Sequence, residues 1–233
     1  RPALLSRSIW YGYGFFDRGE GRTMREYSQW RVRNRMGESL KVYCGHAWQT
    51  IIRERQKEFD AHPEYLALVK GKRQGEQLCV SNPGLRKLVV DYALDYFRKR
   101  PDADMVSLDC SDGRGQCECE ECANLGTISD RVFGLANEAA KAVAKEYPGK
   151  MVGLYAYAEH SEPPHFKLEP NVYIQLTHGF IRGQYTFDEL TTLWPQYCNS
   201  MGYYDYYSVY LWDWDMPPGG RAANVDYVAS SIR

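Results

Sequence analysis

Carboxylates, imidazoles and aromatic rings follow several short apolar runs in this sequence. Asp112, Glu159 and Asp213 are the acidic examples, and each comes shortly after a run of the kind that forms a buried strand. Carboxylates placed in this way suit hydrolysis of a glycosidic bond, in which one carboxyl protonates the leaving oxygen and a second attacks the sugar, activates water or steadies an acetamido group. The structural alternative is that Asp109 or Asp112 caps the following loop and that Asp213 pairs with an arginine.

Aromatic and imidazole side chains accompany these carboxylates. Flat amphipathic rings suit a sugar-binding cleft, and imidazole nitrogens can hydrogen-bond to hydroxyl groups. The side chains at strand ends that we expect to bind substrate are His46, Trp48, Tyr157, His178, Trp212 and Trp214. Together with the carboxylates, they favour a carbohydrate as the partner of this protein.

The cysteines indicate a second kind of chemistry. Cys117, Cys119 and Cys122 form a C-x-C-x-x-C cluster, with Cys79 and Cys110 available as a fourth ligand. Thiolates this close together can bind one tetrahedral ion, and zinc is its usual occupant. Disulfide bonds in an exported protein and buried free thiols are the alternatives. Because no histidine joins the cluster, we expect any zinc to be structural, with no cofactor serving catalysis.

Two helices that would position these groups have clear end signals. Asn82 and Pro83 start an apolar stripe that runs to Phe97, and Ser129 starts another that ends before Pro148. Apolar runs predict strands at residues 40–44, 104–109, 151–157, 171–177 and 208–213, and further helices are expected at residues 24–36 and 188–198.

The alternation of strands and helices predicts an α/β fold with a parallel sheet covered by helices. The sequence has no glycine-rich GxGxxG after a strand and no Walker motif, so a (β/α)8 barrel of the TIM type fits better than a doubly wound sheet. In such a barrel the chemistry lies at the C-terminal ends of the strands. We expect one domain over residues 1–233, a barrel that lacks its last unit and belongs to a longer protein.

Charge and hydrophobicity exclude other classes of function. Lys and Arg number 29 against 30 Asp and Glu, so the net charge of −1 gives no global attraction to nucleic acid or to anionic lipid. No apolar run approaches the ~20 residues needed for a transmembrane helix. The aromatic content of 14% is high and fits a core, an interface or a sugar-binding cleft.

Several segments occur here in an order shared with one bacterial family. They are His46-Ala47-Trp48, His62-Pro63-Glu64-Tyr65, Gly71-Lys72-Arg73, residues 78–83, Ser107-Leu108 leading to Asp112, the cysteine cluster, Ala156-Tyr157 with Pro163-Pro164, Asn171-Val172 and Leu211-Trp212-Asp213. From about Arg31 onward the chain resembles the domain-of-unknown-function family 4838. Members of that family include glycoside hydrolase family 163, endo-β-N-acetylglucosaminidases that act on complex N-glycans. The chain also looks distantly like the α-glucuronidase and β-hexosaminidase barrels.

The resemblance implies a catalytic barrel within a secreted, periplasmic or surface-bound protein with flanking domains. It matches the positions of Asp112 and Asp213 but not that of Glu159, so we assign the first two as the principal pair and Glu159 as the alternative acid. It also implies that Cys79 rather than Cys110 completes the cysteine cluster.

The function expected from this resemblance is that of a retaining glycosidase. A catalytically idle carbohydrate-binding barrel and an α-glucuronidase-like exo-enzyme are the alternatives. The last of these requires a basic residue in the pocket to hold a uronate.

Overall fold

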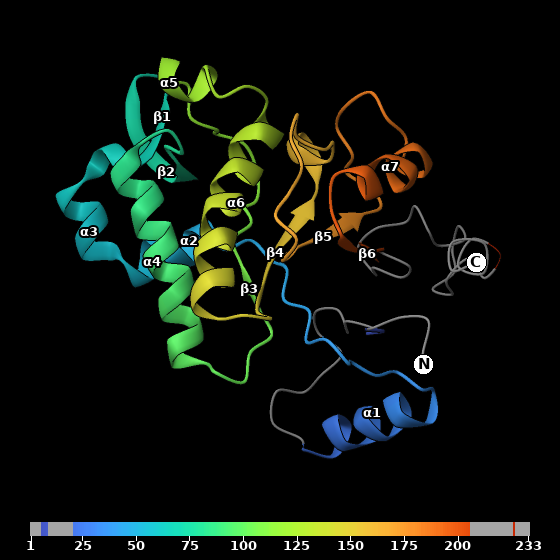
Figure 1. Ribbon diagram of the computed structural model, residues 1–233. Coiled ribbons are helices and arrows are strands. Elements are labelled where there is room, and N and C mark those ends of the chain that lie inside the picture. The colour runs from blue at the N-terminus through green and yellow to red at the C-terminus, as the bar shows by residue number, and fades with distance from the viewer. Residues whose placement is uncertain (1–5, 9–20, 206–225, 227–233) are drawn as a thin grey trace. The chain divides into compact units, whose positions relative to one another are not determined.

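The computed structural model describes residues 6–8, 21–205 and 226 of the chain (Figure 1). Contacts within the chain divide it into two compact units, one of residues 1–42 with 205–233 and one of Tyr43–Tyr204. The described part of the first unit contains helix α1 (Gly21–Arg33), close to the helix predicted at residues 24–36. In the same unit Arg31 forms an ion pair with Glu38 at 2.9 Å.

The second unit is built on a parallel sheet of strands β3 (Met105–Ser107), β4 (Met151–Ala156), β5 (Val172–Thr177) and β6 (Ser200–Tyr204). The strands lie side by side in sequence order, with Val152 opposite Val172 and Ile174 opposite Met201. The predictions of strands at residues 104–109, 151–157 and 171–177 are therefore confirmed. β6 was not predicted, and the strand expected at residues 208–213 lies outside the described residues.

Long helices cover one face of this sheet (Figure 1). Helix α4 (Pro83–Lys99) packs against β3, and α6 (Ile128–Glu146) packs against β4, β5 and α4. The alternate residues Val152, Leu154 and Ala156 of β4 are fully buried, as a sheet face covered by helices requires. Beyond β5, α7 (Phe187–Leu193) and the short helix η3 (Trp194–Gln196) occupy the predicted helix at residues 188–198.

The helix ends explain why α4 and α6 were predictable. The Asn82 side chain accepts hydrogen bonds from the backbone nitrogens of Gly84 and Leu85 at 2.9 and 3.1 Å. At α6 the cap is Thr127, which forms a reciprocal capping box with Asp130, so the helix begins one residue earlier than Ser129. Such side-chain acceptors satisfy backbone donors that the first helical turn leaves without partners.

Residues 48–80, for which no helix or strand was predicted, form short helices and a hairpin. The region consists of α2 (Trp48–Glu54), α3 (Gln56–Ala61), the short helix η1 (Pro63–Tyr65) and an antiparallel hairpin, β1 (Leu66–Val69) with β2 (Lys72–Leu78). The hairpin turns at Lys70 and Gly71, whose φ angles are +50° and +75°. After β3, the chain continues through a loop to the one-turn helix α5 (Glu120–Ala123).

The strand predicted at residues 40–44 is wrong, although part of this segment lies beside β3. Its continuation makes one parallel bridge, between His46 and Asp109, and the backbone nitrogen of Gly45 donates to Ser107 Oγ at 3.0 Å. Gly153 leaves the space for this segment, since a Cβ atom there would lie 2.5 Å from the Tyr43 carbonyl oxygen. The chain is thus held against the sheet by single contacts and not by a ladder.

The predicted α/β class with a parallel sheet is confirmed. Within the described part of the chain, none of the helices combines the length and apolar character that a bilayer span requires.

Candidate functional site

Asp109 is a fully buried carboxylate at the C-terminal end of β3. Its Oδ1 lies 3.0 Å from Nε2 of His160, and its Oδ2 lies 3.2 Å from Nδ1 of His46. Burial raises the pKa of Asp109, but the charge and hydrogen bond of His160 together with those of His46 outweigh burial, so the pKa is lowered. Asp109 is therefore an ionised anchor beneath the sheet edge.

His46 is held between this anchor and the solvent. Its Nδ1 lies 2.8 Å from the Cys110 carbonyl oxygen as well as 3.2 Å from Asp109 Oδ2, and because both are acceptors this nitrogen must carry a proton. The carbonyl is the nearer acceptor, and Oδ2 of Asp109 makes the longer and weaker of the two contacts. Burial lowers the pKa of His46, but the hydrogen bond and charge of Asp109 outweigh it, and the pKa is raised.

The second ring nitrogen of His46 faces Asp112, at 3.8 Å from Oδ1. The Asp112 side chain is 66% exposed, and its Oδ1 also accepts from the backbone nitrogen of Gly113 at 2.8 Å. Burial, followed by the nearby Asp112 carboxylate, raises the pKa of Tyr157 to about 12, so this phenol keeps its proton at neutral pH. An open carboxylate is thus flanked by the phenol of Tyr157, which carries a proton, and by Nε2 of His46, which carries one when the ring is protonated on both nitrogens.

Aromatic rings surround His46 on the same edge. The ring centroids of Tyr155 and Tyr157 each lie 5.6 Å from that of His46, and Tyr155 stacks on Tyr204 of β6 at 5.8 Å. Tyr157 also meets the ring of Phe180 at 5.7 Å. The end of the sheet therefore gathers several half-buried aromatic rings, of which Tyr157 is next to Asp112.

Glu159 lies on the turn that follows β4 and forms an ion pair with Arg182. The turn begins at Ala158, which has a φ angle of +47° that side-chain-bearing residues rarely adopt. Glu159 and Arg182 border a hollow of about 500 Å³. The hollow is lined by Thr127, Ile128, Ser129, Glu159, Glu162, Pro163, His165, Arg182 and Gln184.

The loop that carries Asp112 is tied to the β1–β2 hairpin next to this site. Ser111 Oγ donates to the Glu76 carbonyl oxygen at 2.8 Å, and Gln77 Nε2 donates to the Ser111 carbonyl oxygen at 2.7 Å. Ser111 Oγ also accepts from the backbone nitrogen of Gln49 at 3.0 Å. The residue immediately before Asp112 is therefore fixed from two sides.

The expectation for Trp48 is corrected by the structure. Its side chain is 0% exposed and its Nε1 donates to the Leu108 carbonyl oxygen at 2.9 Å, so the ring is a core anchor and has no face for a sugar. The His178 ring packs against Phe187 at the start of α7, with centroids 4.5 Å apart. Asp213, Trp212 and Trp214 lie outside the described residues.

Three residues of this edge were not assigned from the sequence: Asp109, His160 and Arg182. Asp109 and His160 follow predicted strands, so their positions were a usable signal, but a carboxylate there can equally cap a loop. Arg182 lies in the irregular segment between β5 and α7 and has no spacing signal.

Cys110 lies next to His160 without forming a nucleophilic pair. Its sulfur lies 3.7 Å from Nδ1 and 3.9 Å from Nε2 of that ring. Burial and the charge of Asp109 raise the pKa of this thiol well above its ordinary value. Cys110 is therefore a buried neutral thiol.

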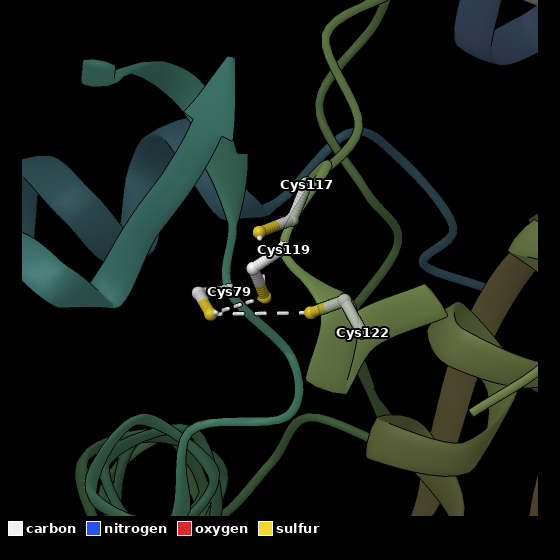
Figure 2. Close-up of side chains that lie close together, drawn as sticks. All are labelled: Cys79, Cys117, Cys119 and Cys122. Carbon is white, nitrogen blue, oxygen red and sulfur yellow. Dashed lines mark hydrogen bonds between the residues drawn. The ribbon is translucent and has the colours of Figure 1, made fainter. Parts of the chain in front are cut away.

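Four further cysteines lie together at a second place, between the hairpin and α5 (Figure 2). Cys79 follows β2, Cys117 and Cys119 lie on the loop after β3, and Cys122 lies on α5. All four side chains are buried, and their sulfurs lie within 4.8 Å of one another. The cluster contains Cys79 and not Cys110, as expected.

One family model, described as a domain of unknown function (DUF4838), matches residues 2–211 of the chain. No curated protein matches it.

Proposed function

This chain belongs to the DUF4838 family, and we propose that it is a glycoside hydrolase acting on a complex glycan or a polysaccharide. The observation that carries the proposal is the open carboxylate of Asp112, flanked by His46 and Tyr157 at the C-terminal end of a parallel sheet. Glycosidic-bond hydrolysis canonically uses two carboxyl groups, and Asp112 supplies one that is open to a ligand.

In this proposal Asp112 acts on the reacting end of the sugar. Its side chain is exposed, and its carboxylate is oriented by His46 and Tyr157, which can also hydrogen-bond to sugar hydroxyls. For an endo-β-N-acetylglucosaminidase-like retaining reaction, the carboxylate either attacks the anomeric carbon or steadies the substrate's own acetamido group as that group attacks. This chemistry needs no cofactor.

The second carboxyl group is Asp213, with Glu159 as the alternative; it protonates the glycosidic oxygen, which leaves as its bond to the anomeric carbon breaks. Glu159 already forms an ion pair with Arg182, so a substrate would have to compete with the guanidinium for this carboxylate. That contact favours Asp213 as the residue that completes the pair.

The architecture we propose around this site is a (β/α)8 barrel. Its supporting feature is the run of four parallel strands in sequence order, with helices on one face and the candidate residues at the strand ends. The proposed setting is a secreted, periplasmic or cell-surface protein that meets glycans outside the cytoplasm.

The test is cleavage of a glycoprotein carrying complex N-glycans, with glucuronoxylan assayed in parallel. Asp112→Asn and Asp213→Asn should each lower the cleavage rate by about 10²–10⁴-fold while glycan binding is kept. Asp91→Asn, an exposed aspartate on α4, is the matched control and should cleave at the parent rate. A parent rate in Asp112→Asn would make Asp112 structural and remove the basis of the proposal.

The same assays separate the alternatives. Binding of the N-glycan without cleavage by the parent protein would replace the enzyme with a carbohydrate-binding module. Cleavage of glucuronoxylan alone would favour the α-glucuronidase-like activity, for which Arg182 in the hollow is the basic residue available to a uronate.

A further inference from the structure

We propose that Cys79, Cys117, Cys119 and Cys122 bind one structural Zn²⁺ ion, which fastens the loop carrying Asp112 to the β1–β2 hairpin. The proposal rests on the geometry of the four thiols and is independent of the proposed glycosidase activity. It assigns to the chain a metal centre that carbohydrate hydrolysis does not require.

The spacing of the sulfurs fits a tetrahedral ion. Zn–S bonds of ~2.3 Å place the sulfurs of a tetrahedral site about 3.8 Å apart. The Cys79 sulfur lies 3.7 Å from that of Cys119 and 3.9 Å from that of Cys122, and the sulfurs of Cys117 and Cys119 are 3.4 Å apart. Figure 2 shows the four sulfurs turned toward a common centre.

The surroundings supply the donors that a cluster of thiolates needs. The backbone nitrogen of Leu68 donates to the Cys117 sulfur at 3.2 Å, and Nη1 of Arg73 approaches the same sulfur at 3.7 Å. Ser81 Oγ lies 3.1 Å from the Cys122 sulfur. Such outer partners orient the ligands of a metal and tune its binding.

The charges also balance better with a cation than without one. On binding, each thiol releases its proton to solvent and coordinates as a thiolate, so Zn²⁺ with four thiolates carries a net charge of −2. The Arg73 guanidinium beside Cys117 offsets part of this charge. Glu118, Glu120 and Glu121 are all exposed to solvent, and Glu121 hydrogen-bonds to the Cys119 side chain.

The four ligands come from two segments that hydrogen bonds also join. Cys79 belongs to the end of the hairpin, while the other three close the loop that begins after β3. Ser111 fixes the start of this loop to the hairpin, and at its far end the backbone nitrogen of Glu118 donates to the Leu68 carbonyl oxygen at 2.8 Å. A metal at the four sulfurs would lock that far end, leaving Asp112 on a short span between two fixed points.

Elemental analysis of the protein, purified without added metal and again after incubation with zinc, tests the site directly. We expect about one zinc per chain, and X-ray absorption at the zinc edge should show a sulfur shell at ~2.3 Å. Cys79→Ser and Cys122→Ser should lose the zinc. Cys198→Ser, which alters a buried thiol bonded to the Trp194 carbonyl oxygen, is the matched control and should retain it.

Because the ligand variants could unfold, hydrogen exchange of the parent protein gives a second readout. Removal of the metal by a chelator should speed exchange at residues 66–78 and 110–122, and added zinc should restore protection. A parent protein that binds no zinc, that holds iron in its place, or that carries disulfide bonds among the four cysteines would overturn the proposal. None of these results depends on whether a glycan is cleaved.

Discussion

The edge that contains Asp112 and the cluster of four cysteines share one loop but differ in how their charges are satisfied. At the edge, the buried carboxylate of Asp109 already contacts two imidazoles, those of His46 and His160. In the cysteine cluster all four side chains are thiols, and the cationic group described next to them is the guanidinium of Arg73. The contacts among Asp109, His46 and His160 therefore fix the protonation states at the edge without an added ion. The four cysteines, in contrast, need an added cation to stay together as thiolates.

The comparison also separates two aspartates that are three residues apart. Asp109 is fully buried and fixed by two imidazoles, while the side chain of Asp112 is 66% exposed. Burial suits a residue that organises its neighbours, and exposure suits one that meets a ligand.

Asp109→Ala should destabilise the protein by about 3–5 kcal/mol. It removes the carboxylate that His46 and His160 contact and leaves both imidazoles beside an empty buried space. Urea denaturation measures the change. Asp112→Ala is the matched control, and its effect should stay within ~0.5 kcal/mol because its carboxylate is open to solvent. Equal losses in the two variants would contradict the distinction between anchor and ligand-facing residue.

Arg73→Gln should weaken zinc binding by about 10–100-fold, the usual consequence of removing an outer partner of a metal ligand. Competition with a chromophoric chelator measures this affinity. Arg53→Gln, on the exposed side of α2, should leave it unchanged. An unchanged affinity in Arg73→Gln would show that the cluster needs no help from this guanidinium.

The smallest effect concerns pH. The pKa of His46 is raised in the folded state above its ordinary value of 6.5, so the stability it contributes is fully present below pH 6.5 and is lost as pH rises through the folded pKa. The pKa of Asp109 is lowered, so its contribution is present above its ordinary value of 3.8 and is lost as pH falls through the folded pKa. One such group changes stability by about 1.4 kcal/mol for each pH unit between its two pKa values.

An NMR titration of the imidazole resonances checks this assignment. The midpoint of His46 should lie above 6.5 in the parent protein and fall in Asp109→Asn, while Asp91→Asn should leave it in place. A midpoint that does not respond to loss of the Asp109 charge would break the link between the two residues.

Local signals explain which parts of the fold were predictable. Asn82 and Pro83 specify the start of α4 through contacts within a few residues, and the buried run at Val152–Ala156 specifies β4. The hairpin lacks such a signal, because most of Lys72–Leu78 is exposed or half-buried and its residues are polar. Pairing with β1 and the bonds to Ser111 stabilise β2, and neither is visible as a pattern in the sequence.

The candidate site was predictable in residue type but not in role. Asp112, His46 and Tyr157 were all expected at strand ends, and the structure brings them together. The sequence could not separate an exposed ring from a buried one, which is why Trp48 was assigned to substrate. Asp109 becomes an anchor through residues about fifty or more positions away, so its role depends on tertiary packing.

The left-handed backbone of Ala158 governs how the side chains of Tyr157 and Glu159 are oriented relative to each other. An L-residue pays about 1–2 kcal/mol for that conformation, which glycine would adopt freely. Glycine, however, would let the chain rotate between Tyr157 and Glu159, and the directions of both side chains would spread. Alanine at this position keeps the backbone strained and the two side chains in a fixed relative orientation.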